Sequence, residues 1–215
     1  MSEQKGRGSS ARRRFVPATV VSGLAVAALS LTTLSGSSAG FAASITNSNN
    51  TAASGVLVMQ ETNSAGTTTC TSTDGGTVST NSSTCTTINK FGGSTTMVPG
   101  QSVVTTVNIK NIGTVPANTF TLTPGSICTQ SNNGALNGTA TDFCAKLDIV
   151  VTSGATTVFN GTAATLAGAT PIALSAPVAP GTSVPFTFTT TLSSTAGNTY
   201  QGLAASLPLT WTFNS

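Results

Sequence analysis

The sequence predicts an all-β protein, an antiparallel β-sandwich of the jelly-roll or immunoglobulin-like type. Apolar side chains alternate with Thr, Ser and Asn over several short stretches, and this period of two is typical of strands with one buried and one solvated face. Turn-forming pairs such as Pro99-Gly100 and Pro180-Gly181 separate the stretches. Helical patterns are nearly absent. Many short strands at this spacing are expected to pack as two sheets.

The predicted strands place their apolar residues on one face. The residues expected on the buried face of each strand, Thr105 among them by its place in the alternation, are Val103, Thr105, Val107 and Ile109; Phe120 and Leu122; Leu147, Ile149 and Val151; Phe186, Phe188 and Leu192; and Leu207, Leu209, Trp211 and Phe213. Thr187, Thr189 and Thr191 are expected on the opposite, solvated face of their strand. Pro208 indicates an edge strand or a bulge, because proline cannot donate a ladder hydrogen bond.

The first 42 residues have the order of a secretory signal peptide. Five of the eight Lys and Arg residues precede position 15, an uncharged stretch covers 19–34, and small residues follow. The apolar stretch is shorter than the ~20 residues that a membrane-spanning helix needs. We expect cleavage between Ala42 and Ala43; a cut after Ala39 and an uncleaved anchor are the alternatives. Arg12-Arg13-Arg14-Phe15 loosely resembles a twin-arginine signal, so the export route stays open.

The predicted organisation has three parts. Residues 1–42 are the signal peptide, residues 43–59 an N-terminal arm with the first strand, and residues 60–215 the sandwich. The expected location is extracellular or at the cell surface. We expect contact with a membrane only through the signal segment, before its cleavage.

The charge pattern argues against nucleic acid as a partner. The whole chain has a net charge of +3, but residues 43–215 keep three Lys against four acidic residues, a net charge of 3 − 4 = −1. Neutralising phosphates takes clustered Lys or Arg, which this part lacks. A surface with so little charge also does little to keep neighbouring copies apart, which favours self-association.

Four cysteines in an exported chain indicate two disulfides. Of the three pairings of Cys70, Cys85, Cys128 and Cys144, the near-neighbour one is favoured, because each pair brackets a loop rich in Gly, Asn and Ser. A four-thiolate zinc site is the alternative, but it lacks a Cys-x-x-Cys pair.

The residue types predict no enzymatic activity, no catalytic residues, no metal and no cofactor. The chain has no histidine, whereas a zinc peptidase of the common type needs His-Glu-x-x-His. The same absence leaves a Ser or Thr nucleophile without its usual base, and residues 43–215 contain no Ser-x-x-Lys. Asp142 and Asp148 are candidates for a Ca²⁺ site, but calcium usually takes six to eight oxygen ligands. Solvated strand-end residues explain them more simply.

The single Trp and the single Tyr are assigned structural roles. Trp211 shares a face with Leu209 and Phe213, so we expect it to pack in the core and not to serve as an exposed sugar platform. Tyr200 precedes Gln201-Gly202, and we expect its hydroxyl to hold a turn in place.

Four segments in order resemble the TasA and camelysin-like family of exported bacterial surface and biofilm-matrix proteins. They are Ala42–Asn47 with Ala53–Leu57; Pro99–Val103 through Lys110-Asn111-Ile112-Gly113-Thr114; Phe143–Val151; and Asn198–Gly202 with Leu209-Thr210-Trp211. Together they span most of the chain after residue 42. The low charge and the four cysteines depart from the fibre-forming members.

The resemblance implies a jelly-roll subunit that a dedicated signal peptidase cuts and that assembles into extracellular fibres. In such fibres an N-terminal strand completes the sheet of the next subunit; here the donor would be Ala43 to Met59. An open sheet edge has unpaired N–H and C=O groups, and a flexible segment of another chain supplies their partners. The residues expected to pair are Ser44, Ile45, Val56, Leu57 and Val58, and the partner is a second copy or a homologous surface protein.

Two other functions stay open. A monomeric surface adhesin, or an accessory module that caps a fibre of another protein, would have the same fold and export signal. Some camelysin-like relatives are classed as metallopeptidases, but the absence of histidine argues against that activity here.

Overall fold

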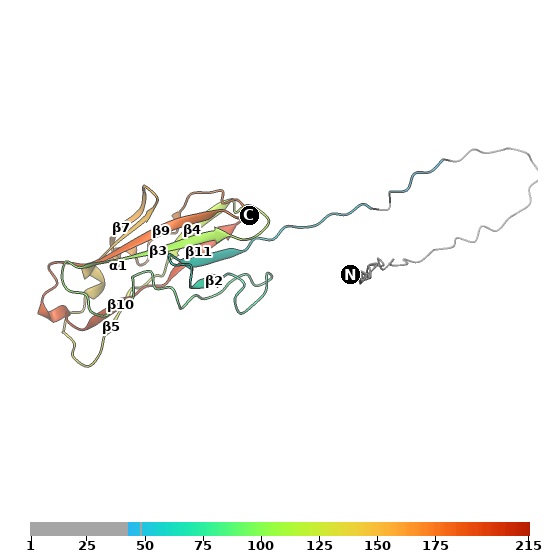
Figure 1. Cartoon of the computed structure of the whole chain (residues 1–215). Coiled ribbons are helices and arrows are strands. Elements are labelled where there is room, and N and C mark those ends of the chain that lie inside the picture. The colour runs from blue at the N-terminus through green and yellow to red at the C-terminus, as the bar shows by residue number, and fades with distance from the viewer. Residues whose placement is uncertain (1–42, 48) are drawn as a thin grey trace, which may run out of the picture. The chain divides into compact units, whose positions relative to one another are not determined.

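The structure, a computed structural model, describes residues 43–47 and 49–215. The predicted signal peptide, with Ala39 and Ala42 at its predicted cleavage positions, lies outside these residues. Residues 51–215 form one compact unit, and all its strand pairs are antiparallel (Figure 1). The predicted antiparallel β-sandwich is therefore confirmed.

The larger sheet has six strands in the order β2-β1-β3-β9-β6-β7. Their bounds are β1 Met59–Asn63, β2 Thr69–Thr71, β3 Ser102–Asn111, β6 Leu147–Ser153, β7 Thr156–Thr162 and β9 Ser183–Leu192. Val107 pairs with Phe186, and Val151 with Phe188. Because side chains alternate along a strand, these four residues share one face, and all four are buried. The predicted apolar faces of these strands are thus the core face.

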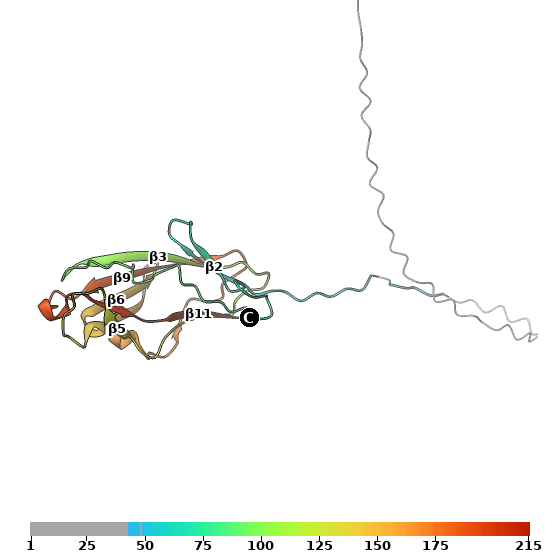
Figure 2. The ribbon, with the colours of Figure 1, turned by 90° about the horizontal axis from the view of Figure 1, so that it is seen from below.

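The second layer consists of two small sheets (Figure 2). One has the order β11-β4-β8 and the other pairs β10 with β5. Their bounds are β4 Thr119–Pro124, β5 Thr129–Asn132, β8 Ile172–Ala173, β10 Leu203–Ser206 and β11 Leu209–Asn214. Pro208 separates β10 from β11, and its carbonyl accepts a 2.8 Å hydrogen bond from the N–H of Gly125, in the matching break between β4 and β5. Pro208 therefore lies between two strands and is not the edge or bulge position within the last strand that its place in the alternating stretch from Leu207 predicts.

Aromatic side chains join the two layers. Phe120 of β4 meets Phe186 of β9 edge to face, with ring centroids 5.7 Å apart. Trp211 of β11 lies 4.6 Å from the same Phe186 ring and 6.3 Å from Phe188. The edge-to-face arrangement of Phe120 with Phe186 and of Phe188 with Trp211 is a favoured aromatic geometry. The expectation that Trp211 packs in the core therefore agrees with its contacts, although its side chain is only half-buried.

Three short helical segments lie between strands: η1 Phe143–Lys146, α1 Ala163–Leu166 and η2 Asn198–Tyr200. The side chains of Thr162 and Thr165 form a capping box at the start of α1. Sequence periodicity missed α1, because a helix of four residues is too short to show a period. None of the helices in the described part is long and apolar enough to cross a membrane.

Two disulfides hold the loops of the sandwich. Cys70 of β2 is bonded to Cys85, and Cys128 is bonded to Cys144 in η1. This is the near-neighbour pairing that the loops between the cysteines favour. The bonds close loops of 15 and 16 residues, and each contributes ~3 kcal/mol in the chain-entropy model.

Candidate functional site

The segment that follows β3 holds the start of β1 in place. The carbonyl of Val58 accepts a 2.9 Å bond from Ile112, and the carbonyl of Val56 accepts a 2.6 Å bond from Thr114. The Thr114 hydroxyl oxygen accepts in turn from the N–H of Val56 at 2.8 Å. A Cβ on Gly113 would lie 2.3 Å from the Val56 carbonyl oxygen, so only glycine fits at this approach.

Asn111 fixes the shape of this segment. It is fully buried, and its Nδ2 donates to the carbonyls of Val115 and Val178 at 2.9 Å each. Its Oδ1 accepts from the N–H of Gly113 at 2.9 Å. One side chain thus serves three backbone groups that are buried or partly buried, and such groups need hydrogen-bond partners. The sequence indicates a turn at 111–113, but not that Asn111 is its internal support.

The structure divides the predicted donor residues into two groups. Ser44 and Ile45 lie in an exposed segment without regular secondary structure, and the Ile45 side chain is 94% exposed. Val56, Leu57 and Val58 instead contact their own sandwich: the carbonyl of Leu57, for example, accepts a 2.7 Å bond from Asn81. The exposed residues run through Val56, but the N–H of Val56 is already hydrogen-bonded to Thr114, and Gly55 lies close to the Val115 side chain. We call residues 43–55 the arm; the part of the predicted donor that follows it belongs to the fold.

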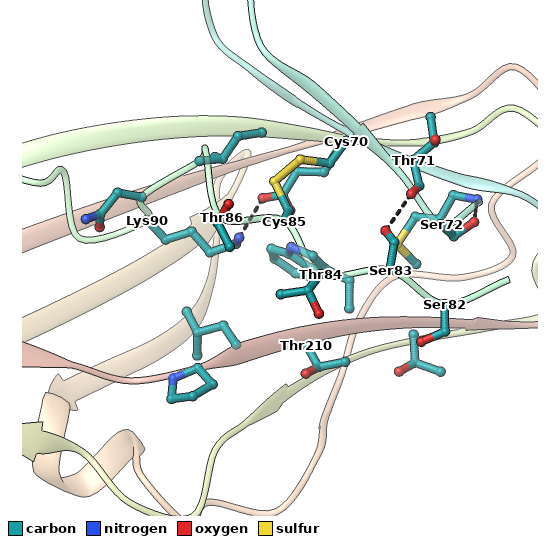
Figure 3. A pocket seen from close by; sticks show the side chains of 18 of the residues that line it. Cys70, Thr71, Ser72, Ser82, Ser83, Thr84, Cys85, Thr86, Lys90 and Thr210 are labelled. Carbon is teal, nitrogen blue, oxygen red and sulfur yellow. Dashed lines mark hydrogen bonds and ion pairs between the residues drawn. A yellow bond between two sulfur atoms is a disulfide. The ribbon is translucent and has the colours of Figure 1, made fainter. Parts of the chain in front are cut away.

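A groove of about 670 Å³ lies between the two layers of the sandwich. One wall consists of β1, β2 and the loop 81–91 that carries Cys85, and the other is the stretch Ala205–Phe213. Figure 3 shows Cys70, Cys85 and Lys90 above the groove and Thr210 on the strand below. Residue types alone do not reveal this groove, because its walls are more than 100 residues apart in the sequence.

The lower wall is an open strand edge. β11 lies at the end of its sheet, where it pairs with β4, and no other strand among residues 43–47 and 49–215 pairs with its opposite edge. The outward N–H and C=O groups of an edge strand are a template for another strand. No residue from Leu209 to Asn214 is charged, and Lys on an edge strand is a common obstacle to such pairing.

Trp211 brings an unused donor to this groove. Its Nε1 is buried and has no hydrogen-bond partner in the described part of the chain. A buried indole N–H usually finds an acceptor.

The upper wall contains a buried ion pair. The Nζ of Lys90 lies 2.7 Å from Oε1 of Glu61, and the two side chains are only 10% and 8% exposed. The Glu61 oxygen forms no other polar contact in the described residues, so Lys90 is what compensates its charge. A paired Lys and Glu add no net charge, so this wall does not select for a charged segment.

The remaining sequence candidates have structural contacts. The Tyr200 hydroxyl donates a 2.7 Å bond to Asp142, and this bond raises the pKa of Tyr200. It joins η2 to the start of η1, in line with the expected role of Tyr200 in holding a turn. Asp148 pairs with Thr191 and Thr162 in the larger sheet. Within residues 43–47 and 49–215 no three His, Cys, Asp or Glu side chains are grouped to hold a metal ion.

No family model and no curated protein matches this chain in sequence comparisons. The candidate site consists of an exposed arm, an open strand edge and a groove beside that edge.

Proposed function

We propose that this chain is a secreted, non-enzymatic structural subunit of cell-surface or extracellular-matrix fibres, and that it assembles by strand addition. The acceptor is the open edge of β11 with its groove. The donor is the arm, residues 43–55, of a neighbouring copy. The observation that carries the proposal is the uncharged, unpaired edge of β11 beside a groove of about 670 Å³.

The length and chemistry of the arm suit this role. Residues 43–55 would span ~40 Å in extended form, whereas the six residues of β11 need ~20 Å. The arm is uncharged and consists mainly of small polar residues, which suits a narrow groove with a polar rim. Ile45 is its only large apolar residue, and we assign it to the apolar part of the groove beside Trp211 and Phe213.

The energetic source of assembly is the pairing of backbone groups that otherwise face water. Strand addition supplies main-chain hydrogen bonds, and side chains that enter pockets set the register. Burial of Ile45, which is 94% exposed in the subunit, adds about 2 kcal/mol.

The proposed location outside the cytoplasm is supported by the disulfides and by the pattern of residues 1–42. Two disulfides persist in oxidising surroundings, which supports a location outside the cytoplasm. The basic head and short apolar stretch of residues 1–42 support export by a signal peptide.

Electron microscopy of the chain that begins at Ala43, at raised concentration, tests the proposal. We expect fibres from this chain and none after deletion of residues 43–54. Thr210→Lys places a charge on the groove side of β11 and should prevent assembly, whereas Thr189→Lys, on the outer face of β9, should not. A synthetic peptide of residues 43–55 should inhibit assembly in trans.

Two outcomes would contradict strand addition through this edge. One is monodisperse monomers at every concentration, with and without the arm. The other is fibres that form equally well with Thr210→Lys. Copurification of a different surface protein in a fixed ratio would instead favour the accessory-module alternative.

A further inference from the structure

A second cavity, of about 290 Å³, lies beside the groove and shares Asn89, Phe91 and Ala205 with it. Its floor is formed by buried residues of both layers: Phe143, Leu147, Thr190, Leu192, Ala196 and Leu203. Exposed residues such as Ser94 and Gln201 form its rim. The cavity thus has an apolar interior and a polar mouth, the usual arrangement of a small-molecule site.

The loop 89–101, which contains Lys90 of the ion pair and leads into β3, forms one wall of this cavity. Phe91 and Met97 of the loop are half-buried and pack against the core. The carbonyl of Thr95 accepts a 2.8 Å bond from Nδ2 of Asn133, which lies beyond the end of β5. These contacts hold the wall in position, so the cavity is preformed.

Thr190 supplies the one specific polar group of the floor. It lies on the core face of β9 between Phe188 and Leu192, and it is 1% exposed. Its Oγ1 has no hydrogen-bond partner among the described residues. A buried hydroxyl without a partner lowers stability, and a ligand group that reaches it recovers this free energy.

Charge and size restrict the ligand. None of the lining residues is Asp, Glu, Lys or Arg, so a charged ligand would enter without a counter-charge. An apolar cavity of about 150 Å³ binds benzene. A cavity of 290 Å³ therefore has room for a molecule of about ten to fifteen non-hydrogen atoms.

We propose that this cavity is a binding site for a small neutral alcohol or phenol. The apolar body of the ligand contacts Phe143, Leu147 and Leu203, and its hydroxyl exchanges a hydrogen bond with Oγ1 of Thr190. A hydroxyl suits Thr190 because either group can donate while the other accepts. The site does not depend on strand addition and would operate in the monomer.

The test uses the full chain and three probes of similar shape: 2-naphthol, naphthalene and 2-naphthoate. Binding is followed by the NMR shifts of residues that line the cavity. We expect saturable binding of 2-naphthol, weaker binding of naphthalene, and no binding of the charged 2-naphthoate. Thr190→Val removes only the hydroxyl and should weaken 2-naphthol binding about fivefold without changing naphthalene binding. Thr189→Val, one position away on the opposite face of β9, is the matched control and should change neither affinity.

Three results would overturn the assignment. The first is the absence of saturable shifts in the cavity at millimolar 2-naphthol. The second is an unchanged 2-naphthol affinity in Thr190→Val while both variants stay folded. The third is equal binding of 2-naphthoate, which would show that the cavity does not select a neutral ligand.

Discussion

Replacing Asn111 with Ala should destabilise the sandwich, because this buried side chain serves three backbone groups that are buried or partly buried. The change removes three bonds of 2.9 Å and leaves the Val115 carbonyl and the Gly113 N–H without these partners, whereas the Val178 carbonyl keeps a 3.0 Å bond from the N–H of Ala117. Each lost bond costs about 1 kcal/mol. The expected loss in the free energy of unfolding is therefore ~2–3 kcal/mol.

Urea unfolding followed by fluorescence of Trp211, the single tryptophan, measures this loss directly. Asn108→Ala is the matched control: Asn108 is a half-buried residue of the same strand, and its side chain makes no hydrogen bond in the described structure. We expect that control to change stability by less than about 0.5 kcal/mol. A loss below about 1 kcal/mol for Asn111→Ala would refute the reasoning, because water or backbone relaxation would then replace the three bonds.

Three further outcomes are expected. Lys90→Met should lower the free energy of unfolding in urea by about 3–5 kcal/mol, because it leaves the Glu61 carboxylate buried and unpaired. The double variant Lys90→Met with Glu61→Leu should be nearly neutral. Equal losses in the single and double variants would show that the two residues are not coupled. Gly113→Ala should displace the start of β1, because the new Cβ would lie 2.3 Å from the backbone oxygen of Val56. Limited proteolysis of the segment that follows residue 43 should then be faster, and unchanged cleavage would contradict the prediction. The bond to Asp142 raises the pKa of Tyr200 above its ordinary value of 10.0. The stabilisation of the fold by this bond should therefore be complete below pH 10 and be lost as pH rises through the raised pKa of the folded state. Tyr200→Phe should therefore reduce the loss of stability at alkaline pH. Urea unfolding between pH 8 and 11 measures this loss, and an equal loss in Tyr200→Phe and in the unchanged protein would contradict the prediction.

The sequence by itself was sufficient for the fold class and for local contacts. Alternation in 186–192 places Phe186 and Phe188 on the core face, because the side-chain period of a strand is two whatever its neighbours are. The near-neighbour pairing of Cys70 with Cys85 was also accessible, since a short loop rich in turn residues brings its ends together. Thr190, however, occupies a core position that the apolar pattern alone does not reveal.

Only the tertiary structure decided the strand order and therefore the candidate site. The pairing of β1 with β3 and of β11 with β4 joins segments far apart in the chain, and alternation does not encode which strand becomes a neighbour. This order leaves the edge of β11 open and places it opposite the Glu61–Lys90 pair. It also engages Val56–Val58 with the segment after β3, which limits the free arm to residues 43–55. The physical reason is that local sequence sets which face of a strand is buried, whereas open edges and cavities arise from packing between distant strands.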